Sequence, residues 1–60
     1  MTAYIVYLKS DAAAAYEVAF CETDAEAREW ADAIVTLTPG FELAAIQRTR
    51  AGRPETLASH

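Results

Sequence analysis

Few residues of this 60-residue chain could carry catalysis. It has one cysteine, Cys21, and one histidine, His60, which falls in a segment that we predict to be a tail. A cysteine nucleophile needs a neighbouring base or positive charge to lower its pKa, and no histidine or lysine lies near Cys21 in the sequence. Ser10, Thr36 and Thr38 likewise lack the partners of a catalytic triad. We therefore expect a protein that is not an enzyme.

Metal and cofactor sites are not expected either. A single histidine and a single cysteine do not suit a structural zinc site, and two glycines are too few for a phosphate-binding loop. Carboxylates do gather around the predicted helix, and their oxygens could bind Mg²⁺ or Ca²⁺. They are Glu22, Asp24, Glu26, Glu29 and Asp32. Because their spacing matches no loop motif, we interpret them as a solvated acidic face.

Arg48, Arg50 and Arg53 are the strongest candidates for recognition of another molecule. Residues 1–47 carry 8 acidic and 2 basic residues, whereas residues 48–60 carry 3 arginines and 1 acidic residue. Such a cluster could contact the phosphates of a nucleic acid or an acidic peptide. Charged residues on an edge strand also protect against aggregation, which is the alternative interpretation. The formal charge of −4 argues against nucleic-acid binding by the whole surface.

Two strands are predicted in the first third of the chain. Residues 3–9, AYIVYLK, are rich in β-branched and aromatic residues and apolar at both sets of alternating positions, as in a strand covered on both sides. Residues 10–14 are expected to form a loop. Residues 15–22 are expected to form a strand because Tyr16, Val18 and Phe20 recur at every second position. The alanine run leaves a helix from Asp11 to Cys21 as an open alternative.

A helix is predicted to begin after Thr23 and to end near Leu37. Thr23 and Glu26 have the spacing of a capping box, and Pro39 disfavours helical geometry at the residue before it. Trp30 is expected to fill the space between this helix and a sheet. The complete inner face is expected to be Ala27, Trp30, Ala31, Ile34 and Leu37.

Residues 41–50 alternate as a third strand, and residues 51–60 are expected to form a flexible C-terminal tail. A right-handed crossover through the helix makes the second and third strands parallel, with the first strand between them and antiparallel to both. The predicted fold class is therefore α+β, a single ββαβ domain over residues 1–50. It has a three-stranded antiparallel sheet of order 2-1-3 and one helix packed on one face.

One helix covers only one face of such a sheet. If Phe41 and Leu43 face the helix, the opposite face should display Ala19, Cys21, Ala44 and Ile46, which we predict to be a dimer face. We expect a small homodimerising protein-interaction or regulatory module. A monomer whose uncovered face is only weakly apolar remains an alternative. A nucleic-acid-binding module that uses the three arginines ranks second, and a small enzyme ranks third.

The sequence contains no apolar run of the roughly 20 residues that span a bilayer. It also lacks the basic start and long apolar stretch of a signal peptide. We therefore expect a cytoplasmic protein without a membrane partner.

Overall fold

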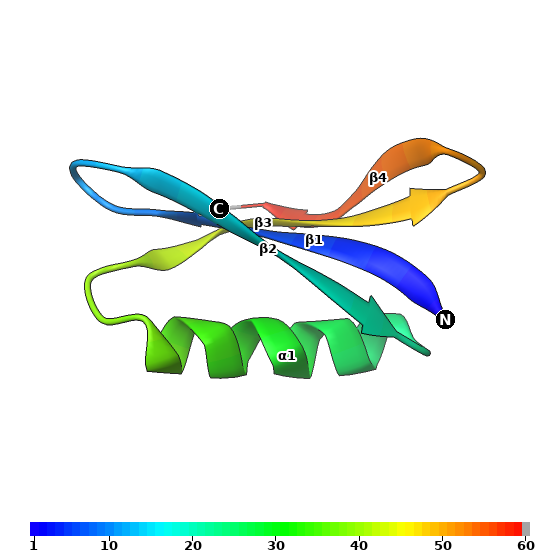
Figure 1. Ribbon diagram of the computed structural model, residues 1–60, viewed down its shortest axis with the longest axis horizontal. Coiled ribbons are helices and arrows are strands. Elements are labelled where there is room, and N and C mark those ends of the chain that lie inside the picture. Colours follow the sequence, from blue (N-terminus) through cyan, green and yellow to red (C-terminus); the bar gives the residue numbers. More distant parts are fainter. Residues whose placement is uncertain (60) are drawn as a thin grey trace.

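The computed structural model describes residues 1–59, which form four strands and one helix (Figure 1). Their bounds are β1 (Thr2–Lys9), β2 (Ala14–Cys21), α1 (Asp24–Leu37), β3 (Glu42–Arg50) and β4 (Arg53–Ser59). The strands form one antiparallel sheet of order β2-β1-β3-β4, and α1 lies against one face of it. The α+β class, the single covering helix and the 2-1-3 order of the first three strands are confirmed.

The number of strands differs from the prediction. Residues 53–59, expected to belong to a tail, form β4 and pair with β3, so the sheet has four strands rather than three. Arg50 lies opposite Arg53, and the two residues between them, Ala51 and Gly52, have positive φ angles of 51° and 76°. Two residues with positive φ are typical of the tight turn of a β-hairpin. His60 lies outside the described residues.

A four-residue loop connects β1 to β2, because Lys9 lies opposite Ala14. The Ser10 backbone N–H donates to the carbonyl of Ala13 at 2.8 Å, and the Ser10 hydroxyl accepts from the Ala13 N–H at 3.0 Å. Serine side chains commonly close turns in this way. The strand predicted over residues 15–22 is confirmed with bounds one residue earlier, Ala14–Cys21, and the alternative helix from Asp11 to Cys21 is wrong.

The helix has the ends that the sequence predicts. The Thr23 hydroxyl accepts from the Glu26 N–H at 3.1 Å, and the Glu26 carboxylate accepts from the N–H of Glu22 at 3.4 Å. The last residue of α1 is Leu37, and the N–H of Thr38 donates to the carbonyl of Val35. No helix within residues 1–59 is long and apolar enough to cross a bilayer.

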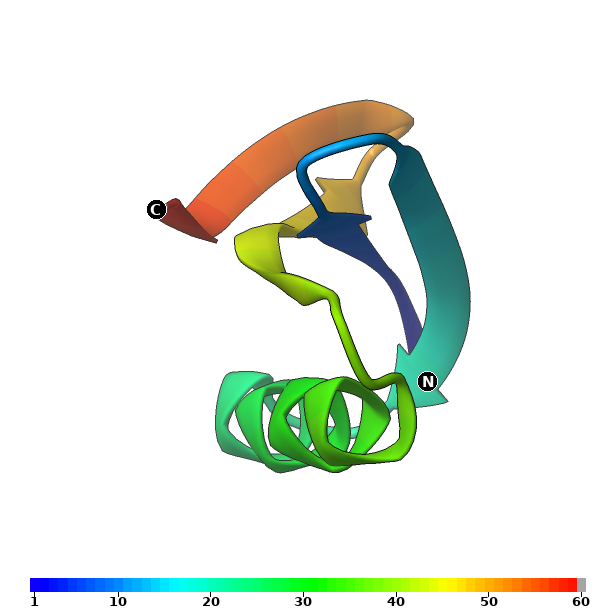
Figure 2. The ribbon, with the colours of Figure 1, turned by 90° about the vertical axis from the view of Figure 1, so that its left-hand side faces the viewer.

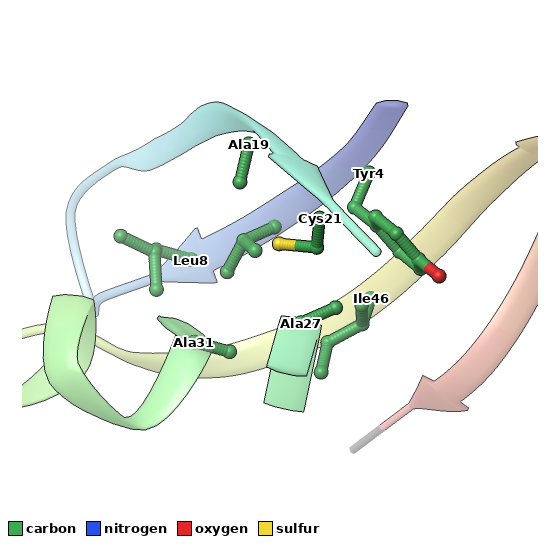
Figure 3. Close-up of a cluster of buried hydrophobic side chains, with 8 residues drawn as sticks. Tyr4, Leu8, Ala19, Cys21, Ala27, Ala31 and Ile46 are labelled. Atoms are coloured by element: carbon green, nitrogen blue, oxygen red, sulfur yellow. The ribbon is translucent and has the colours of Figure 1, made fainter. Parts of the chain in front are cut away.

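The core lies between α1 and the sheet (Figures 2 and 3). Ala27 and Ala31 are fully buried, so the helix approaches the sheet closely and the bulky core side chains come from the strands. The buried set is Tyr4, Val6, Leu8, Ala19, Cys21, Ala27, Ala31 and Ile46. Ile34, Val35, Phe41, Leu43 and Leu57 pack around its margin.

A β-bulge interrupts the pairing of β1 with β3. Tyr7 lies opposite Ala45 and Leu8 lies opposite Leu43, which leaves Ala44 as the extra residue. The bulge shifts the alternation of β3, so that Leu43 and Ile46 both pack toward the helix although they are three positions apart. A second irregularity lies between Ile46 and Gln47, where β3 pairs with β4.

Candidate self-association surface

The predicted dimer face is not the face that the helix leaves uncovered. Ala19, Cys21 and Ile46 are buried beside the helix alanines, so their placement on the uncovered face is wrong. Leu43 does pack toward the helix, as expected, but the bulge at Ala44 then turns Ile46 to the same side. In β2, Ala19 lies opposite the buried Tyr4, which fixes the small residues of this strand toward the core.

The uncovered face carries a different apolar set. Because Tyr4, Val6 and Leu8 point to the helix, the alternate residues of β1 point away from it. These β1 residues are Ala3, Ile5 and Tyr7. The β2 residues opposite them are Phe20, Val18 and Tyr16, in that order. The Tyr7 and Tyr16 ring centroids lie 6.4 Å apart and their planes are tilted by 47°.

The β2 members of this set are exposed. Tyr16, Val18 and Phe20 have exposed fractions of 66%, 50% and 63%. These three large side chains stand at alternate positions on one strand, so they leave a strip of apolar surface exposed along β2.

The other half of the uncovered face is polar. Gln47 lies opposite Ile5 from β1 and opposite Thr56 from β4. The Gln47 amide Nε2 donates to the Thr56 hydroxyl at 3.5 Å, and the next pair outward is Thr49 with Pro54. The apolar surface is therefore confined to the β1 and β2 side of the sheet.

Trp30 extends this surface around the edge of the sheet. The prediction that Trp30 fills the space between helix and sheet is wrong. Its side chain has an exposed fraction of 52%, and Ala27 and Ala31 make the contact with the sheet instead. Leu37, also expected on the inner face, is 81% exposed. Trp30 instead lines a groove of about 330 Å³ between α1 and β2, together with Val18, Ala19, Phe20, Cys21 and Glu26. We call Tyr16, Val18, Phe20 and Trp30 the β2 surface.

Arg48 is engaged inside the protein. Its Nη1 lies 2.7 Å from Oδ2 of Asp24 in the first turn of α1, and its Nη2 lies 2.8 Å from Oε2 of Glu55 on β4. The Tyr4 hydroxyl donates to the other Asp24 oxygen at 2.6 Å. With a side chain only 17% exposed, Arg48 joins β1, α1, β3 and β4 in one hydrogen-bonded network.

The other two arginines lie on the β3–β4 hairpin. Arg50 Nε is 3.6 Å from Glu55 Oε1, and Arg53 lies opposite Arg50 in the register. The structure therefore brings the three predicted residues to one end of the sheet, but it places two carboxylates among them. β3 is an interior strand, so Arg48 and Arg50 do not lie on a sheet edge, whereas Arg53 lies on the edge strand β4. Three guanidinium groups and two carboxylates therefore lie together at this end of the sheet.

The pKa values of this network follow from its hydrogen bonds. The hydrogen bond from Tyr4 holds the pKa of Asp24 below its usual value, and Arg48 adds to this effect. The hydrogen bond from Arg48 lowers the pKa of Glu55. The hydrogen bond to Asp24 raises the pKa of the Tyr4 phenol. The lowered pKa values of Asp24 and Glu55 mean that both carboxylates stabilise the folded chain when they are charged.

The single cysteine and the acidic side chains are the groups to examine for chemistry. Burial raises the pKa of the Cys21 thiol, and the Glu26 carboxylate adds to this shift, so the thiolate is disfavoured. No three histidine, cysteine or acidic side chains within residues 1–59 are placed to hold a metal ion. A wider hollow of about 560 Å³ is lined by Asp32, Val35, Thr36, Glu42 and Leu43, a set without an activated nucleophile.

The fold and the surface define a small α+β protein with a four-stranded antiparallel sheet, one covering helix and an apolar surface around the edge at β2. No protein-family model, curated protein or solved structure matches the chain. The sequence does carry a signal for this surface, since Tyr16, Val18 and Phe20 alternate. That alternation alone favours a place in the core, because large apolar residues are usually buried.

Proposed function

We propose that this chain is a non-enzymatic protein that forms a homodimer and acts through protein contact, as a regulatory or accessory subunit. The observation that supports this proposal is the exposure of Tyr16, Val18, Phe20 and Trp30 on one continuous surface around β2. Exposed apolar residues scattered singly need no explanation, but a contiguous group of large ones is typical of an interaction site.

The small size of the domain supports the same proposal. A chain of about 60 residues buries a smaller share of its surface than a larger domain does, and its stability is correspondingly marginal. Among the eight apolar residues buried in the described part of the chain, three are alanines, Ala19, Ala27 and Ala31, which contribute little area. A second copy that covers the β2 surface would enlarge the core without any change in the fold.

The position of the apolar residues favours self-association over anion binding. The arginine cluster, our alternative site for a nucleic acid, contains Arg48, whose guanidinium already contacts Asp24 and Glu55. In the β2 surface, the Tyr16 ring lies beside the ring of Tyr7, and half or more of each of Val18, Phe20 and Trp30 is exposed. Among the described residues, Glu26 is the only charged one in the lining of its groove.

The mass of the chain in solution tests the proposal. Light scattering over a range of concentrations should give twice the chain mass of 6.5 kDa. Phe20→Ser removes a large side chain from the β2 surface and should return the protein to the monomer mass. Leu37→Ser is the matched control, because Leu37 is even more exposed but lies in the last turn of α1, outside the groove. It should leave the dimer intact.

Two results would overturn the proposal. One is a single species of 6.5 kDa at every concentration of the unmodified chain. The other is a dimer that Phe20→Ser and Leu37→Ser weaken equally, because association would then not depend on the β2 surface.

A further inference from the structure

The two edge strands of the sheet, β2 and β4, differ in how well they are protected against pairing with another chain. β4 begins with Arg53 and Pro54, and its pairing with β3 is irregular. Charges, prolines and bulges are the usual means by which an edge strand avoids pairing with another chain. β2 has none of these except Glu17, and its eight residues pair with β1 without a shift in register. Its outer edge faces no other strand within residues 1–59.

We infer that β2 pairs antiparallel with β2 of a second copy, around a two-fold axis at Val18, to give one continuous eight-stranded sheet. This inference rests on the proposed homodimer and specifies its geometry. An open strand edge presents a row of backbone donors and acceptors, and another strand is the partner that satisfies them together. The same strand in a second copy has the same length and the same apolar residues, as a two-fold interface requires.

The charge on β2 selects the position of the axis. An axis at Val18 places Tyr16 opposite Phe20 of the partner subunit and Glu17 opposite Ala19 of the partner subunit. Aromatic cross-strand pairs are favourable, whereas like charges directly opposite each other are not. An axis at Glu17 would bring the two carboxylates together. The Val18 axis is therefore the one that matches the aromatic residues and separates the charges.

The exposed area is of the size that a dimer requires. Aromatic side chains offer about 150–250 Å² each, so the exposed parts of Tyr16, Phe20 and Trp30 supply roughly 350 Å² per copy. A specific interface needs at least about 500 Å² per partner, and the paired backbones would supply the rest. Tyr16 and Phe20 would cover the junction on one face of the sheet, and Trp30 with its groove would cover it on the other.

Disulfide trapping tests this geometry. In a Cys21→Ala background, which removes the natural thiol from the core, Val18→Cys would place two cysteines opposite each other across the axis. The Cα atoms of opposed residues in antiparallel strands are about 4.5–5.5 Å apart, within the range of a disulfide. Under mild oxidation, Val18→Cys should give at least about tenfold more covalent dimer than Ala33→Cys, an exposed position on α1.

A mixed experiment tests the register. Tyr16→Cys and Phe20→Cys chains in the same background should form a covalent heterodimer with each other, and each alone should form little covalent dimer. Light scattering of the unmodified chain, with the Cys21→Ala chain measured beside it, decides separately whether a dimer exists. A dimer that is not trapped through Val18→Cys overturns the β2 pairing and leaves the proposed function standing. A monomer overturns both.

Discussion

Arg48 on β3 binds Asp24 at the start of α1, with 2.7 Å between Nη1 and Oδ2. These residues are 24 positions apart in the sequence, and their contact fixes the first turn of the helix to the sheet. Glu55 binds the other terminal nitrogen of the same guanidinium, so one side chain holds both the helix and the last strand.

Replacement of Arg48 should therefore destabilise the fold. Arg48→Ala leaves Asp24 and Glu55 without their shared partner, and we expect the melting temperature to fall by several degrees in a calorimetric scan. Arg48→Lys keeps the charge but cannot donate to both carboxylates in the planar geometry of arginine, so its melting temperature should lie between those of Arg48→Ala and the unmodified chain. Arg53→Ala, at the exposed end of the hairpin, is the control. An equal fall in Arg53→Ala would contradict a special role for Arg48.

The stability of the protein should decrease in acid. The pKa values of Asp24 and Glu55 are lowered from the usual values of 3.8 and 4.5, so the unfolded chain takes up protons first as the pH falls. This contribution to stability is fully present above the usual values and is lost as the pH falls through the lowered ones. Urea midpoints between about pH 6 and pH 2 should record the loss.

A double variant isolates this contribution. Asp24→Asn with Glu55→Gln cannot titrate at these two positions, so its urea midpoint should change less over the same pH range. If the double variant loses as much stability in acid as the unmodified chain, other groups cause the acid sensitivity.

The turn between β3 and β4 offers a gain in stability. Ala51 has a φ of 51°, a left-handed conformation that costs a residue with a side chain roughly 1 kcal/mol. Ala51→Asn introduces the Asn-Gly pair preferred in two-residue hairpin turns and should raise the free energy of unfolding by about 0.5–1 kcal/mol. Chemical denaturation measures the change.

Gly52→Ala is the opposite test of the same turn. Gly52 has a φ of 76°, and a methyl group there would meet no atom within 4 Å, so any loss of stability comes from the backbone conformation alone. We expect a loss of about 1 kcal/mol. No loss would mean that the hairpin does not hold this conformation in solution.

The helix contact depends on small residues rather than on the tryptophan. Ala31→Leu adds bulk where α1 meets the sheet and should destabilise the protein by about 1–3 kcal/mol. Ala33→Leu, on the exposed side of the same helix turn, should have little effect. Trp30→Ala should lower the free energy of unfolding by less than the roughly 3–5 kcal/mol that is typical when a buried aromatic residue is replaced by alanine. Denaturation at low protein concentration measures the stability of each variant without a contribution from association.

Local signals in the sequence predict much of the fold. The capping box at Thr23 and Glu26, the proline after α1 and the two-sided apolar pattern of β1 act within a few residues, and each predicts its element correctly. The order of the first three strands follows from the handedness of the crossover.

The remaining features depend on contacts between distant residues. The bulge at Ala44 arises from the pairing of β3 with β1, and it reverses the predicted side of Ile46. β4 contains a single large apolar residue, Leu57, so its strand is not distinguishable from a tail until β3 provides a partner. The sequence does not reveal the two ion pairs of Arg48, because its acidic partners lie 24 and 7 positions away.

The unequal edges of the sheet also bear on how many chains can join. If two chains pair through their β2 edges, both β2 edges are covered. Within residues 1–59 of each chain, the only sheet edges then left exposed are the two β4 strands, which begin with Arg53 and Pro54. Growth then stops at a pair instead of continuing into a fibre. Replacing these two residues by threonine or valine would make the second side receptive, and elongated aggregates should appear where the unmodified chain gives particles of one size.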